Sequence, residues 1–166
     1  RQKFEQALEQ AKALQALAPE NPHFELLVAH QQVAIGNFDA ALSIYDQMIK
    51  ALPNEPNVSL TQGHALKTVG HQDEAIRAYR RAYELKPDLG DAFWSLANLK
   101  TYSFSDAEIE QMQAGEAARH VSTPDRYHLC FALGKAFEDR SDFAQAFRYY
   151  DRGNSLKREE LNYSAQ

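Results

Sequence analysis

Cysteine, long apolar runs and excess basic charge are all scarce in this chain, and each shortage excludes a class of protein. Cys130 is the only cysteine among 166 residues. A single cysteine rules out an internal disulfide framework and is compatible with a reducing compartment, so we expect a cytoplasmic protein. The mean hydropathy of -0.57 and the lack of a long apolar run exclude a membrane span. A net charge of -5 argues against nucleic acid as a partner, because its phosphates require a basic surface.

What the chain does contain is a repeat with a period of 34 residues. Pro19, Pro53 and Pro87 stand at this interval, and several small and aromatic residues keep step with them: Gly36 and Gly70; Ala7, Ala41 and Ala75; Tyr45 and Tyr79. Self-similarity at this period is typical of tetratricopeptide repeats, in which each unit is a helix–turn–helix. The pattern therefore predicts an all-α fold, a right-handed superhelical solenoid of antiparallel helix pairs.

The same register sets the expected organisation of the chain. We expect a half repeat with only its second helix at 1–21, full repeats at 22–55 and 56–89, a divergent repeat with a longer connection at 90–123, a repeat at 124–158, and a tail at 159–166 toward a missing C-terminal domain. Because the opening residues already resemble a helix, we expect this chain to be a piece of a longer protein. Gly36 and Gly70 should occupy the turns between helices, and Gly63 a close approach of two helices.

Local capping signals divide the second half. Ser105 and Glu108 form the pattern of a capping box, which predicts a helix that ends near His120. Thr123 followed by Pro124 then predicts the next start, with threonine as the N-cap and proline at the first helical position.

The second half also resembles a narrower family. Four segments occur in the order found in the N-terminal region of bacterial tetratricopeptide-repeat sulfotransferases: Phe93–Lys100, Phe104–Asp106, Phe131–Asp139 and Gly153–Asn154. The resemblance implies a bacterial parent chain that transfers sulfonate from 3'-phosphoadenosine 5'-phosphosulfate. The glycine-rich phosphate loop of that family is absent here. We therefore expect no catalytic residue, no cofactor and no enzyme activity in this chain itself.

In tetratricopeptide arrays, positions 2, 5, 9, 12 and 13 of each unit face a concave groove. We expect this groove to bind a protein or peptide, and its best candidate residues are His30, His64, Lys67, Trp94, Asn98, Phe131, Lys135 and Glu138. The rule also selects His23, Leu26, Val33, Asn57, Leu60, Asp91, Thr101, Tyr102, His128 and Asp139. Trp94 and Phe131 would be anchors, because aromatic side chains dominate many interfaces. The alternative is that Trp94 packs between helices or against the missing domain.

Three other sites are weighed and disfavoured. His30 and His64 could share a metal ion, but neither has a second histidine at i+4 or flanking carboxylates, so we expect no metal. Cys130 lies at a packing position without an activating base, so we expect a buried and inert thiol. A clamp for a peptide carboxylate is disfavoured because Asp91 stands where a lysine is needed.

The sequence therefore predicts a protein–protein interaction or substrate-presenting module, the N-terminal part of a sulfotransferase-like protein. The alternative is a stand-alone tetratricopeptide scaffold without an enzymatic domain, and a free-standing enzyme is the weakest reading. Besides the groove ligand, we expect contact with the parent's C-terminal domain. A homodimer could form through the apolar face of the half repeat, around Phe4, Leu8 and Leu14.

Overall fold

The computed structural model describes residues 2–163, and within them every regular element is an α-helix. Nine helices follow one another along these residues: α1 (Gln2–Leu17), α2 (Pro22–Ile35), α3 (Phe38–Ala51), α4 (Pro56–Thr68), α5 (Gln72–Leu85), α6 (Gly90–Ala97), α7 (Asp106–Ala117), α8 (Thr123–Asp139) and α9 (Phe143–Tyr163). The predicted all-α fold class is confirmed. The chain forms two compact units, residues 1–82 and 83–166, and the division falls inside α5.

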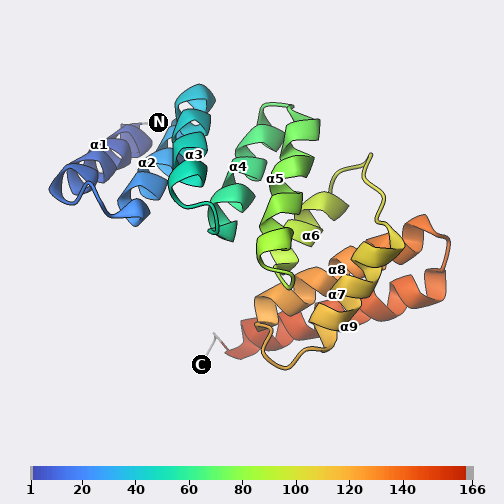
Figure 1. The fold of residues 1–166 in the computed structure, drawn as a ribbon. Coiled ribbons are helices and arrows are strands. Elements are labelled where there is room, and N and C mark those ends of the chain that lie inside the picture. Colours follow the sequence, from blue (N-terminus) through green and yellow to red (C-terminus); the bar gives the residue numbers. More distant parts are fainter. Residues whose placement is uncertain (1, 164–166) are drawn as a thin grey trace. The chain divides into compact units, whose positions relative to one another are not determined.

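In the first unit, successive helices pack against one another in chain order, α1 on α2, α2 on α3 and α3 on α4 (Figure 1). The core of α2, α3 and α4 joins small residues to two large ones: Ala29, Ala41, Tyr45, Met48, Val58 and Ala65. Alanine at the contact points lets the helix axes approach closely, while Tyr45 and Met48 fill the remaining space. Each hairpin therefore buries its apolar face only by packing against the next one.

The two predicted turn glycines lie between the helices of a pair. Gly36 has φ +84° and Gly70 has φ +87°, both in the left-handed region that side chains with a Cβ seldom adopt. Gly36 is the C-cap of α2, and its N–H donates to carbonyls of the last turn. The prediction for both positions is confirmed.

A glycine–tyrosine contact marks two of the helix pairs. A Cβ on Gly63 in α4 would lie 2.5 Å from the Tyr79 ring of α5, and a Cβ on Gly134 in α8 would lie 2.6 Å from the Tyr150 ring of α9. Each ring occupies the space that the missing side chain leaves. The close approach predicted at Gly63 is confirmed, and the same device recurs 71 residues later.

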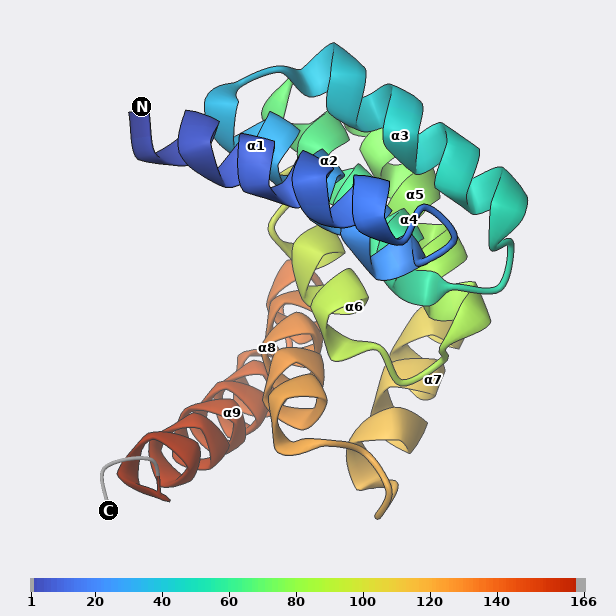
Figure 2. The same cartoon turned by 90° about the vertical axis from the view of Figure 1, so that its left-hand side faces the viewer.

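In the second unit, α8 packs on α6, α7 and α9, and α8 and α9 run side by side as an antiparallel pair (Figure 2). The capping box at the start of α7 is present as predicted, with both Ser105 and Glu108 making their reciprocal bonds. The buried Glu108 carboxylate also accepts hydrogen bonds from Tyr83 Oη, at 2.8 Å, and from Tyr102 Oη.

Two boundaries in this unit differ from the expectations. The helix α7 ends at Ala117, three residues before His120. The N-cap of α8 is Ser122, not Thr123, because Ser122 has extended backbone angles and its Oγ accepts from Asp125 N at 3.2 Å. Thr123 is already helical, and Pro124 is the second helical residue.

The two ends of the described chain also differ from the sequence analysis. Leu8, expected on the bare face of the half repeat, is buried with Ala11 against Val28 of α2. Phe4, Leu14 and Leu17 of α1 remain exposed. At the other end, α9 continues to Tyr163, so residues 159–163, expected as a tail, are helical. Residues 164–166 lie outside the described residues. No helix in the described part of the chain is both long enough and apolar enough to cross a membrane.

Candidate protein-binding surface

The eight candidate groove residues divide between the two units. His30, His64 and Lys67 belong to the first unit and are exposed. The His64 Nδ1 lies 3.0 Å from Tyr79 Oη, so the ring shares a hydrogen bond with the tyrosine that fills the space beside Gly63. The His30 ring lies 6.5 Å from Tyr45 between centroids, and partial shielding from water lowers the pKa of His30. His30 is therefore neutral at neutral pH.

A shared metal site on the two histidines has no supporting geometry. Among the described residues, no group of three or more His, Cys, Asp or Glu side chains gathers closely enough to hold a metal ion. The Nδ1 of His64 already faces a hydroxyl group.

Trp94 and Phe131 meet in the second unit. Their ring centroids lie 5.4 Å apart, and the Tyr127 ring lies 6.1 Å from Phe131. All three side chains are half-buried. We call these three residues, Trp94 of α6 with Tyr127 and Phe131 of α8, the aromatic face. The Phe131 ring packs closely against Gly153 of α9, where an added Cβ would lie 2.8 Å from the ring.

Tyr127 was missed by the sequence analysis, although a signal for it exists. Tyr127 and Phe131 are four residues apart on one helix, and side chains at this spacing lie on the same side. The groove rule selected its neighbour His128 instead, whose ring contacts Tyr127 edge to face at 4.6 Å.

Charged groups surround the aromatic face. Lys157 of α9 places its Nζ over the Tyr127 ring, 5.6 Å from the centroid. Burial raises the pKa of Tyr127, and the nearby carboxylates of Glu160, Asp91 and Asp125 raise it further. Burial lowers the pKa of His128, so this ring is neutral at neutral pH.

The other three candidates of the second unit are engaged within the chain. Asn98 donates from Nδ2 to the Trp94 carbonyl at 2.9 Å and is the C-cap of α6. Lys135 forms an ion pair with Asp139 one turn later. Glu138 accepts a hydrogen bond from Tyr150 Oη at 2.9 Å.

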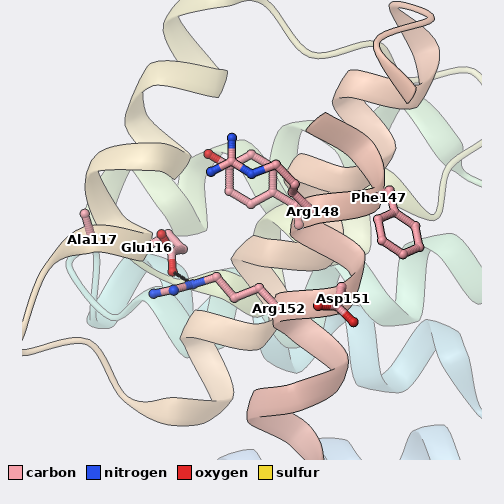
Figure 3. A pocket seen from close by; sticks show the side chains of 7 residues that line it. Glu116, Ala117, Phe147, Arg148, Asp151 and Arg152 are labelled. Atoms are coloured by element: carbon pink, nitrogen blue, oxygen red, sulfur yellow. Dashed lines mark hydrogen bonds and ion pairs between the residues drawn. The ribbon is translucent and has the colours of Figure 1, made fainter. Parts of the chain in front are cut away.

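Among the open pockets outside the aromatic face, two involve residues of interest. One, of about 300 Å³ in the first unit, is lined by Met48 and by three of the selected groove positions, His23, Leu26 and Asn57. The other, of about 650 Å³, lies between α7 and α9 (Figure 3). There Arg152 pairs with Glu116 between the two helices, and Phe147 and Asp151 of α9 are also among the residues that line the pocket (Figure 3).

Cys130 provides no reactive group. Its side chain is fully buried in α8, and burial raises the pKa of the thiol to about 12. Almost none of it is thiolate at neutral pH.

Comparison with known proteins places the fold. Residues 57–89 match the family model of the tetratricopeptide repeat. No curated protein matches the chain. A crystal structure of MamA is similar with a TM-score of 0.65 and 19% identity, over 96% of this chain and 92% of that one.

Two further solved structures agree. A fragment of MamA from Desulfovibrio magneticus RS-1 has a TM-score of 0.61 and 18% identity, over 94% of this chain and 86% of that one. A thermophilic tetratricopeptide-repeat protein of Thermus thermophilus has a TM-score of 0.58 and 13% identity, over 98% of this chain and 87% of that one. The chain therefore contains a tetratricopeptide repeat at residues 57–89, and its fold is that of the tetratricopeptide-repeat proteins.

Proposed function

We propose that this chain is a protein-interaction module and that the aromatic face is its contact surface. The observation that carries the proposal is the pairing of Trp94 with Phe131, both half-buried, with ring centroids 5.4 Å apart on two different helices. Aromatic side chains provide much of the binding energy at interfaces, because they offer large rigid areas at little cost in conformational entropy. The buried, protonated Cys130 offers no nucleophile, so binding fits the side chains better than covalent chemistry.

The test is capture of partners from the source organism by the wild-type chain and by Trp94→Ala and Phe131→Ala variants. A partner that binds the aromatic face should be captured by the wild-type chain and by neither variant. The same partner, once purified, should bind the wild-type chain directly. The matched control is Phe147→Ala, because Phe147 is an exposed aromatic residue of α9 that is not part of the aromatic face. Equal capture by wild type and both aromatic-face variants would contradict the proposal.

We also propose that the parent chain is a bacterial, cytoplasmic sulfotransferase-like protein. The support is the ordered set of segments from Phe93 to Asn154, together with a thiol that suits a reducing compartment. A stand-alone scaffold fits the same fold and the same surface. Radiolabelled sulfonate transfer by the parent protein would favour the first candidate, while the chain of residues 1–166 alone should transfer none.

A homodimer is a further proposal for the first unit. Phe4, Leu14 and Leu17 are exposed on α1, whereas Leu8 is covered by α2 and takes no part. Pairing of two such faces would remove apolar surface from water. Sedimentation across concentrations should show a dimer that the Leu17→Ser variant weakens, and a monomer at all concentrations would rule it out.

A further inference from the structure

The aromatic face is lined with rings that can receive a positive charge. A cation within about 6 Å of a ring centroid is attracted by the negative face of the ring, most strongly by tryptophan. Trp94 and Tyr127 are both half-buried, so part of each ring remains accessible to solvent. The geometry of the rings therefore suits an ammonium or guanidinium group as well as an apolar side chain.

The molecule already binds one cation in this way. The Lys157 ammonium lies 5.6 Å from the centroid of Tyr127, so α9 supplies an internal cation to the aromatic face. Lys157 is exposed, and a long side chain of this kind can be displaced from one position at small cost. In the part of the chain that the structure describes, no lysine or arginine lies over the neighbouring Trp94 ring.

The charges around the aromatic face also favour a cation. Asp91 precedes Trp94 by three residues on α6, which places the two on one side of the helix. Asp91, Asp125 and Glu160 all raise the pKa of Tyr127, and the cations beside them are Lys157 over the ring and Lys86. Asp125 forms an ion pair with Lys86 at 2.9 Å, and Asp91 accepts a hydrogen bond from Ser95 Oγ at 3.3 Å. His128 adds no positive charge at neutral pH, because burial lowers its pKa.

We propose that the aromatic face binds a basic side chain of the partner, an arginine or lysine, between the Trp94 ring and the Asp91 carboxylate. The inference rests on the proposed function and states which chemistry the partner must present. Arginine suits the surface better than lysine, because its planar guanidinium can stack on the indole while its N–H groups face a carboxylate.

The experiment uses the indole signal, because Trp94 is the only tryptophan in the chain. A short capped peptide of alanine and arginine is titrated while the indole fluorescence and the indole N–H resonance are followed. Two control peptides carry citrulline or glutamate in place of arginine. The variants are Asp91→Asn and Lys157→Ala, with Glu110→Gln as the matched charge control on α7. Thermal melts check that each variant is folded.

We expect the arginine peptide to shift the indole signal and the citrulline and glutamate peptides to leave it unchanged. Asp91→Asn should weaken binding of the arginine peptide about threefold to tenfold. Lys157→Ala should strengthen binding by a similar factor, because it removes a competing cation and a like charge. Glu110→Gln should leave the affinity unchanged.

The sign of the Lys157→Ala effect separates the alternatives. If the glutamate peptide binds and Lys157→Ala weakens that binding, the aromatic face is a site for anions. This result would overturn the inference but would still support an interaction surface. If the citrulline peptide binds as tightly as the arginine peptide, positive charge plays no part in binding. This result would also overturn the inference but leave the interaction surface. If no peptide shifts the indole and Trp94→Ala leaves natural partners bound, both the inference and the proposed function are wrong.

Discussion

Asp125 of α8 caps the start of α6 through the backbone of Gly90. The Gly90 N–H donates to Asp125 Oδ1 at 3.0 Å, and a Cβ on Gly90 would lie 2.0 Å from the Asp125 carbonyl oxygen. The N-cap residue of α6, Leu89, makes no side-chain cap of its own. The same carboxylate accepts from Lys86 and Ser122 through Oδ2, at 2.9 Å each. One side chain thus joins the starts of two helices, α6 and α8.

The first prediction concerns this contact. Gly90→Ala should lower the free energy of unfolding by about 3 kcal/mol, because the new methyl group meets backbone that cannot rotate away. Urea unfolding measures the change. The control is Gly115→Ala, which should cost far less, because its Cβ would lie 3.1 Å from the end of the Leu129 side chain and in ordinary contact, at 3.6 Å or more, with Asp88. Equal stability of the two variants would contradict this prediction.

Turns and caps were predictable from the sequence because they depend on few neighbouring residues. Gly36 and Gly70 stand 34 residues apart, and glycine is the residue that a left-handed turn favours. The capping box needs only Ser105 and Glu108. The N-cap of α8 was misplaced because serine and threonine stand side by side before Pro124, and both can cap a helix.

Burial and the surroundings of the candidate surface were harder to predict, because both depend on distant segments. Leu8 is buried because α1 packs on α2, which the pattern of α1 alone does not reveal. Lys157 of α9 lies over Tyr127 of α8, so this contact depends on how the two helices pack. The groove rule named Trp94 and Phe131 as candidates, but their role in binding stays a prediction.

The second prediction concerns the buried carboxylate of Glu108. Burial alone would raise the pKa of Glu108, but hydrogen bonds from Tyr102, Ser105 and Tyr83 together lower it below its ordinary value of 4.5. The ionised form therefore stabilises the fold above pH 4.5, and this stabilisation is lost as the pH falls through the lowered pKa. Glu108→Gln should lose about 2 kcal/mol at pH 7.

Denaturation curves over a range of pH test this directly. The difference in stability between wild type and Glu108→Gln should be constant at neutral pH and shrink below pH 4.5. Ser105→Ala is a useful comparison, because it removes one donor and the helix cap while leaving the carboxylate in place. A difference that grows at low pH would show that Glu108 is not stabilised in its charged form.

The third prediction concerns the thiol. With its pKa raised to about 12 and its side chain fully buried, Cys130 should react with iodoacetamide at about pH 8 far more slowly than a free cysteine. Mild denaturant should restore rapid labelling, because unfolding exposes the thiol and returns its ordinary pKa. Rapid labelling of the folded protein would contradict the burial of Cys130.

The last prediction separates binding from stability on α6. Phe93 and Trp94 are adjacent, but Phe93 is fully buried, stacked at 4.5 Å on Tyr83, whereas Trp94 is half-buried against Phe131. Phe93→Ala should therefore cost about 3–5 kcal/mol of stability, as expected for a large aromatic side chain lost from a core. Trp94→Ala should cost clearly less, because the solvent-facing part of its ring has no core contacts to lose, yet it should weaken partner binding by about 2 kcal/mol or more. Thermal melts and binding titrations on both variants measure the two effects. If Trp94→Ala destabilises the fold as much as Phe93→Ala, Trp94 belongs to the core and the aromatic face loses its anchor.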